Sequence, residues 1–109
     1  MKTTKLLIKT NVKNYPILIG HKLVSKISKI MDENSIKFEK CLLIKDKNVP
    51  KKFVNEIVKS FKGKKIFFHN ISANEKNKNQ KTVNLILNVL LKENFSRDDC
   101  LISVGGGIT

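Results

Sequence analysis

The sequence predicts a single α/β domain, in which a parallel sheet follows an N-terminal β-hairpin. From residue 41 onward, short apolar runs alternate with amphipathic stretches, a pattern typical of parallel strands joined by helical crossovers. Before residue 41, two short apolar runs flank a turn-like tetrapeptide at residues 11–14, which indicates a hairpin. The length of 109 residues suits one domain.

The hairpin strands are expected over residues 4–10 and 15–19. Pro16 has no N–H to donate to a strand ladder, so it predicts an edge or strand-start position for the second strand. From residue 22 to residue 31, apolar side chains recur at the spacing of one helix face, which predicts the first helix.

The parallel sheet is expected to begin with residues 41–44, a continuous apolar run typical of a strand covered on both faces. Pro50 is predicted at the first position of the next helix, with Asn48 as a nearby cap and Gly63 as its C-cap.

The remaining sheet strands are predicted over residues 65–69 and 101–104. Between them, an apolar stripe beginning at Val83 predicts a third helix that ends near Asn94.

The net charge of +13 raises the question of nucleic-acid binding. All of the 22 basic residues except Arg97 are lysines, and they are scattered along the chain. Base readout and phosphate clamps favour arginine, so we interpret the charge as a solvated lysine-rich surface that attracts anionic small molecules in general. A small basic nucleic-acid-binding module remains the non-enzymatic alternative. No apolar run is long enough for a membrane span, and the N-terminus lacks the pattern of a secretory signal.

The two cysteines, Cys41 and Cys100, each stand at the start of an apolar run. We interpret both as small buried thiols in a reducing compartment, in preference to a catalytic or redox role. His21 and His69 are isolated, and the sequence therefore offers no recognisable metal site.

Polar side chains stand where two of the predicted strands end, the place where ligands bind in such sheets. Asp46 and Asn48 follow the strand predicted over residues 41–44. They could receive a ribose, or they could form a turn and a helix cap. Glu75 and Lys78 follow the strand predicted over residues 65–69. They could hold a ribose and a phosphate, or they could form an ion pair at a helix start.

Three glycines, Gly105, Gly106 and Gly107, follow the last strand. They allow a ligand to approach backbone N–H groups closely, although a flexible terminus is the alternative. Because such a turn normally opens a helix, and here only Ile108 and Thr109 follow, we expect the chain to be an N-terminal fragment of a longer enzyme.

Taken in order, these segments resemble the N-terminal NAD-binding part of the 3-dehydroquinate synthase family. The resemblance extends over essentially the whole chain and rests on the order and spacing of short segments: Tyr15-Pro16-Ile17, Asp46-Lys47-Asn48, Glu75-x-x-Lys78, Ser96-Arg97-Asp98 and Gly105-Gly106-Gly107-Ile108. It departs from the family at Ala73 and Asn74, where an acidic residue and a glycine are common.

The resemblance implies a Rossmann-like domain over residues 1–109. Asp46, Asn48, Glu75 and Lys78 would contact the adenosine half of NAD, and Gly105, Gly106, Gly107 and Ile108 would lie under its pyrophosphate. The full enzyme would convert 3-deoxy-D-arabino-heptulosonate 7-phosphate to 3-dehydroquinate and phosphate in the shikimate pathway, by which aromatic amino acids are made. It would be a cytoplasmic homodimer.

The resemblance also implies what this chain lacks. The family holds a divalent metal, zinc or cobalt, in a helical C-terminal domain, and neither those ligands nor the catalytic residues are in these residues. The chain by itself is therefore expected to be inactive. The alternatives are another sugar-phosphate cyclase, or a metal-dependent polyol or alcohol dehydrogenase of the same fold.

Overall fold

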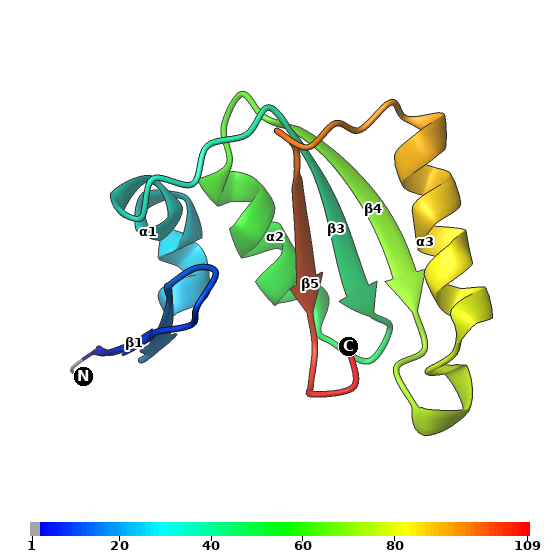
Figure 1. Cartoon of the computed structure of the whole chain (residues 1–109), viewed down its shortest axis with the longest axis horizontal. Coiled ribbons are helices and arrows are strands. Elements are labelled where there is room, and N and C mark those ends of the chain that lie inside the picture. Colours follow the sequence, from blue (N-terminus) through cyan, green and yellow to red (C-terminus); the bar gives the residue numbers. More distant parts are fainter. Residues whose placement is uncertain (1–2) are drawn as a thin grey trace.

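The computed structural model describes residues 3–109 as a three-stranded sheet with helices beside it and a separate hairpin (Figure 1). The elements in chain order are β1 (Thr4–Ile8), β2 (Tyr15–Ile19), the 3-10 helix η1 (Leu23–Lys26), α1 (Ile27–Glu33), β3 (Lys40–Asp46), α2 (Lys51–Ser60), β4 (Lys65–Ile71), the 3-10 helix η2 (Glu75–Asn77), α3 (Gln80–Lys92) and β5 (Cys100–Val104). This arrangement confirms the predicted α/β class.

The three later strands form a parallel sheet in the order β4-β3-β5. Leu42 pairs with Phe67 on one side and with Leu101 on the other, so the apolar runs predicted as strands are neighbours in one sheet. β1 and β2 pair antiparallel in a sheet of their own. Both strands of that hairpin are therefore edges, and Pro16 occupies one of them as expected.

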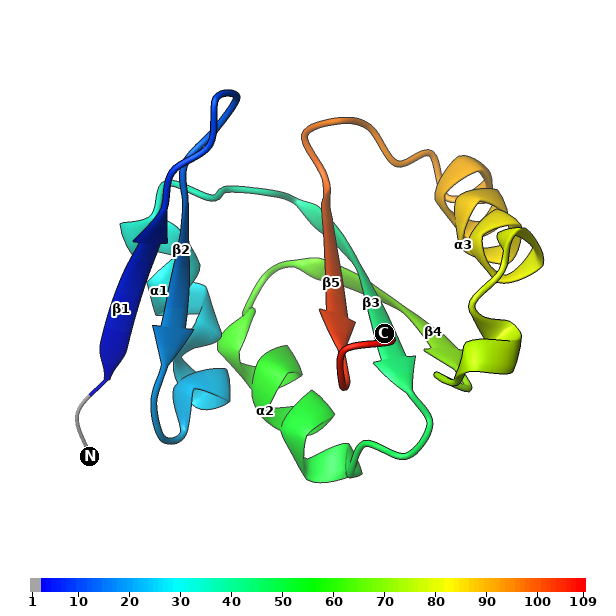
Figure 2. The ribbon, with the colours of Figure 1, turned by 60° about the horizontal axis from the view of Figure 1, so that its bottom comes forward.

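The helices α2 and α3 lie on opposite faces of the parallel sheet (Figure 2). The chain steps from β3 to β4 in one direction, and from β4 to β5 back across β3 in the other. Because strand–helix–strand crossovers are right-handed, steps in opposite directions place their helices on opposite faces.

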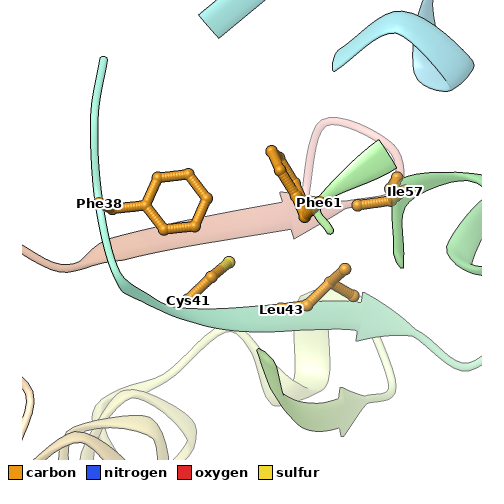
Figure 3. Close-up of a cluster of buried hydrophobic side chains, with 5 residues drawn as sticks. All are labelled: Phe38, Cys41, Leu43, Ile57 and Phe61. Carbon is orange, nitrogen blue, oxygen red and sulfur yellow. The ribbon is translucent and has the colours of Figure 1, made fainter. Parts of the chain in front are cut away.

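The main core lies between the sheet and α2 (Figure 3). Cys41 and Leu43 of β3 are fully buried there, against Ile57 of α2 and the rings of Phe38 and Phe61. The two rings meet edge to face, with centroids 5.2 Å apart, which is a favoured aromatic geometry. The other face of β3 presents Leu42 and Ile44, also buried, so both faces of this strand are covered as its continuous apolar run predicts.

Several element boundaries differ from the sequence prediction. The first helical stretch begins as η1, after Lys22 in a left-handed conformation, and becomes α-helical only at Ile27. Pro50 is the N-cap of α2 and not its first residue, because its ψ of 140° is extended. No side chain in the described part of the chain caps α2, so Asn48 does not have the capping role.

Of the two predicted helix ends, the first differs from the structure and the second agrees with it. α2 ends at Ser60 with Phe61 as its C-cap, so Gly63 lies two residues further, in the following turn with a φ of +77°. The third helix ends near Asn94 as predicted. The backbone of Asn94 has a left-handed conformation, and the N–H of Phe95 donates to the carbonyl of Leu90 at 2.9 Å. These two features make a Schellman-type ending.

The carboxylate of Asp99 anchors the segment that leads into β5. Its Oδ2 accepts a hydrogen bond from the Ser96 N–H at 2.8 Å, and its Oδ1 accepts one from the Lys40 N–H at 3.3 Å. The Lys40 ammonium lies 3.9 Å from Oδ2. These contacts, the Ser96 hydrogen bond first, hold the pKa of Asp99 below its usual value.

Acid is expected to remove the stabilising effect of Asp99. Because its pKa is lower in the folded chain than in the unfolded chain, its contribution is complete above about pH 4 and is lost as the pH falls through the folded value. Asp99→Asn should therefore lower the melting temperature at pH 7 more than it does near pH 2, as followed by circular dichroism. Asp98→Asn is the matched control, since the Asp98 carboxylate makes no hydrogen bond within residues 3–109; equal behaviour of the two variants would contradict this role.

No helix in residues 3–109 has both the length and the apolar character that a membrane crossing requires.

Candidate functional site

The candidate site lies at the carboxyl ends of the parallel strands. All three strands point toward the end of the molecule where the C-terminal turn and the loop after β4 lie (Figure 1). β3 is central, and the chain leaves it toward β4 before returning to β5 on its other side. The crevice beyond the ends of β3 and β5 is therefore the topological switch point, where ligands bind in open α/β sheets.

Asp46 and Gly105 stand on the two sides of this switch point. Asp46 is the last residue of β3, and Gly105 directly follows β5. A Cβ atom on Gly105 would lie 3.2 Å from Cβ of Asp46 and would overlap Oγ1 of Thr109. Gly105 thus allows a close approach between the end of the chain and the end of β3.

The Asp46 carboxylate also joins β3 to the loop after β4. Its Oδ1 accepts a hydrogen bond from the Ala73 N–H at 3.2 Å, while its carbonyl accepts one from the Val49 N–H at 2.9 Å and closes a turn. Oδ2 accepts no hydrogen bond from any residue that the structure describes, so half of this carboxylate is free to receive a ligand hydroxyl.

The loop between β4 and α3 is shaped by asparagine side chains. The Asn74 side chain accepts a hydrogen bond from the Asn77 N–H at 2.9 Å, which caps η2. The Asn77 amide donates to the Ser72 carbonyl at 3.0 Å, and the Asn79 side chain accepts from the Thr82 N–H at 3.0 Å, which caps α3. The two capping bonds, to the N–H groups of Asn77 and Thr82, satisfy helix-start amides.

Glu75 and Lys78 lie in this loop and do not pair with each other. Glu75 begins η2 and Lys78 directly follows it, before α3 has started, and both side chains are exposed. Within residues 3–109, the ion pair between Lys40 and Asp99 is the sole salt bridge. The ion pair at a helix start, which was one interpretation of these two residues, is therefore absent from the described part of the chain.

A pocket of about 120 Å³ lies between this loop, the first turns of α3 and the end of the chain. Lys78 and Ile108 line it, together with Asn74, Asn77 and Thr109. Oγ1 of Thr109 is buried and has no hydrogen-bond partner in the described residues. A buried hydroxyl without a partner carries a desolvation cost.

The turn after β5 leaves its backbone accessible. A Cβ atom on Gly106 or on Gly107 would meet no atom within 4 Å, and the Thr109 N–H donates to the Gly106 carbonyl at 3.1 Å. The N–H groups of Gly106 and Gly107 donate no hydrogen bond to any other residue of the described chain. Two free amides in open space are suited to an anion.

The structure thus brings most of the predicted residues to one edge of the sheet. Asp46, Lys78, Ile108 and the glycine turn lie around the switch point and its pocket. The side chains of Asn48 and Glu75 are exposed and line no part of this pocket.

The loop-shaping asparagines were not predicted from the sequence, although their spacing carries a signal. Asn74 precedes Asn77 by three residues, and Asn79 precedes Thr82 by three, the spacing at which an asparagine side chain caps a following N–H. Ala73 contributes only its backbone N–H, so no side-chain pattern could have revealed it.

This chain is similar to known proteins along its whole length. The family model described as 3-dehydroquinate synthase N-terminal matches residues 68–109. The 3-dehydroquinate synthase of Pelagibacter ubique is 49% identical over 109 residues, which are all of this chain and 30% of that protein. The chain belongs to the N-terminal region of the 3-dehydroquinate synthase family. The 3-dehydroquinate synthase of Clostridium acetobutylicum is 33% identical over 99% of this chain and 30% of its own length. The chain spans about 30% of the length of these curated relatives.

A solved structure shares the fold of this 3-dehydroquinate synthase region. The crystal structure of 2-deoxy-scyllo-inosose synthase matches with a TM-score of 0.80 at 19% identity, over 96% of this chain and 30% of that one. A second structure of that enzyme, complexed with carbaglucose-6-phosphate, NAD+ and Co2+, matches with the same TM-score over 28% of its chain. This similarity confirms the predicted arrangement of hairpin and parallel sheet.

Proposed function

We propose that the protein carrying this chain is a 3-dehydroquinate synthase, a lyase of the shikimate pathway. It converts 3-deoxy-D-arabino-heptulosonate 7-phosphate to 3-dehydroquinate with loss of phosphate. The observation that carries the proposal is the 49% identity over the whole chain to the Pelagibacter ubique enzyme. In this proposal residues 1–109 form the NAD-binding α/β domain, and the helical metal-binding domain of the family lies outside them.

Three features of the described residues fit a bound dinucleotide. The open glycine turn offers the N–H groups of Gly106 and Gly107 to a pyrophosphate. Asp46 retains a free carboxylate oxygen for a ribose hydroxyl. The adjoining pocket is lined in part by Thr109, whose hydroxyl has no partner in the described residues. The related 2-deoxy-scyllo-inosose synthase, which shares this fold, was solved with NAD+.

Each part of the edge receives a role in this proposal. The glycine turn binds the pyrophosphate through backbone amides, with Ile108 beside it in the pocket wall. Lys78 adds a positive charge near the phosphates, while Asp46, Asn48 and Glu75 receive or donate hydrogen bonds at the adenosine ribose. Bound NAD supplies reversible hydride transfer, which allows one carbinol of the substrate to be oxidised transiently and the neighbouring C–H to become acidic.

Residues 3–109 contain no recognisable site for the divalent metal of the family, zinc or cobalt. Within residues 3–109, no three histidine, cysteine, aspartate or glutamate side chains gather as metal ligands would. We therefore assign the metal ligands and the catalytic residues to the family's other domain. The sugar-phosphate substrate, the cytoplasmic location and a homodimeric state also come with the family assignment.

The glutamate of this proposed site provides a first test. Glu75→Ala should weaken NAD+ binding by about ten- to a hundredfold, because it removes one charge-assisted hydrogen bond worth roughly 1.5–3 kcal/mol. Folding should be unchanged, since the Glu75 side chain is exposed and makes no hydrogen bond in the described residues. Calorimetric titration with NAD+ measures the affinity, and Glu56→Ala, an exposed glutamate on α2, is the matched control. Equal NAD+ affinities of the two variants would mean that Glu75 is not part of the NAD site.

The reaction itself is tested with the protein that carries this chain, NAD+ and Zn²⁺ or Co²⁺. A 3-dehydroquinate synthase releases inorganic phosphate from 3-deoxy-D-arabino-heptulosonate 7-phosphate without net reduction of NAD+. A cyclase with another substrate would leave this compound intact, and a polyol dehydrogenase would accumulate NADH. Either result would overturn the proposed reaction.

A further inference from the structure

The two cysteines of the chain lie side by side in the sheet, although 58 other residues separate them in the sequence. Cys41 of β3 and Cys100 of β5 are direct register partners on neighbouring parallel strands. Both side chains face the core beneath α2, where Cys41 belongs to the buried cluster and Cys100 packs against it. Figure 3 shows the Cys41 sulfur on this face, toward Phe38 and Phe61.

The two thiols differ in their access to solvent. Cys41 is fully buried in the central strand, whereas Cys100 is half-buried at the first position of β5. In the order β4-β3-β5, the other side of β5 is an edge within the described residues. Cys100 is therefore the more accessible of the two thiols, and Cys41 is its neighbour in the register.

The two thiols also differ in the direction of their pKa shifts. The pKa of the Cys100 thiol is lowered, chiefly by a hydrogen bond from the Cys41 thiol, against the opposing effect of burial. The pKa of Cys41 is raised by the same hydrogen bond, by burial and by the charge of its neighbour. The more accessible sulfur is thus the one that ionises first, and the thiolate is the reactive form of cysteine.

We propose that Cys100 and Cys41 form a peroxide-reactive pair, in which Cys100 is the attacking thiol and Cys41 is the resolving thiol. The Cys100 thiolate attacks hydrogen peroxide, the O–O bond breaks, and Cys100 becomes a sulfenic acid while hydroxide leaves. The Cys41 sulfur then attacks the Cys100 sulfur; an S–S bond forms, the S–O bond breaks, and water leaves with the Cys41 proton. Overall, two thiols and one peroxide give one disulfide and two waters.

The spacing of neighbouring strands is compatible with this bond. Neighbouring strands lie about 4.8 Å apart, which falls within the range of about 4.4–6.8 Å between the Cα atoms of disulfide-bonded cysteines. The pair lies at the start of β5 and near the start of β3, whereas the candidate NAD site lies at their other ends. Oxidation is therefore expected to crosslink the two strands and to leave that site open.

The experiment treats the reduced full chain with a small excess of hydrogen peroxide, blocks the remaining thiols and maps tryptic peptides by mass spectrometry. Trypsin should release Cys41 in the peptide of residues 41–45 and Cys100 in a peptide that begins at Asp98. We expect these two peptides to be recovered joined, with the loss of two hydrogen atoms, and to separate after dithiothreitol. Both cysteines still free after the peroxide treatment, or disulfides between different chains, would overturn the proposal.

Two variants test the assigned roles. Cys41→Ser should stop the reaction at the Cys100 sulfenic acid, which dimedone traps, whereas Cys100→Ser should react little with peroxide. The matched control, Cys100→Ser/Leu101→Cys, retains two thiols in neighbouring positions, but residue 101 pairs with Leu42 on the opposite face of the sheet. If this control forms the internal disulfide as readily as the parent, the geometry assigned to the pair is wrong.

Discussion

Leu43→Ala is expected to destabilise the fold by about 3–5 kcal/mol, the largest stability effect of any prediction made for this chain. Leu43 is fully buried in the central strand and belongs to the cluster with Cys41, Ile57 and Phe61. Removing its side chain forfeits the transfer free energy and leaves a cavity, because strands on both sides and a helix above restrict collapse. A loss of this size is a large part of the 5–15 kcal/mol that typically stabilises a domain.

Equilibrium unfolding in urea, followed by circular dichroism, measures this effect. Leu101→Ala is the matched control: it removes the same atoms from the same sheet, but Leu101 is 48% exposed on the edge strand β5. We expect its cost to stay below about 1.5 kcal/mol, because about half of the Leu101 surface is already in contact with water. Similar losses for the two variants would mean that β3 is not the centre of the core.

Gly106→Val is expected to weaken NAD+ binding by at least about a hundredfold. The proposed pyrophosphate site uses the N–H groups of Gly106 and Gly107, and hydrogen bonds to a charged group are worth roughly 1.5–3 kcal/mol each. A branched side chain in this open space would exclude the phosphates from both amides, which corresponds to two or more factors of ten in affinity.

The fold itself should tolerate Gly106→Val, so its effect on NAD+ binding can be separated from any effect on stability. A Cβ atom on Gly106 meets no atom within 4 Å, and the melting temperature should therefore change little. Gly106→Ala is the matched control, with a smaller loss of affinity expected from its smaller side chain. If calorimetry gives Gly106→Val and Glu75→Ala the affinity of the parent, the proposed nucleotide site is wrong.

Local patterns were sufficient to predict the strands and helices of this chain. The continuous apolar run at residues 41–44 became the buried central strand, and residues 65–69 and 101–104 fall within its neighbours. The helix starts were less predictable. Pro50 fits both the first helical position and the N-cap with the same φ, and only its extended ψ distinguishes them.

The candidate site could be predicted in outline for the same reason. In a parallel sheet all strands end at the same edge, so residues that follow strands must gather there. The contacts within that edge could not be predicted, because they join segments from different parts of the chain. Asp46 meets the backbone of Ala73 and approaches Gly105, and neither contact has a counterpart in local periodicity.

The sequence by itself determined the fold class, the identity of the buried strands and the set of polar residues at their carboxyl ends, since each depends on hydrophobic patterning within a short segment. Only the tertiary structure decided which distant residues became neighbours. Cys41 and Cys100 looked like two separate small core residues, yet the order β4-β3-β5 makes them register partners. Strand order and register follow from how helices cover the two faces of the sheet, and that packing is a property of the whole chain.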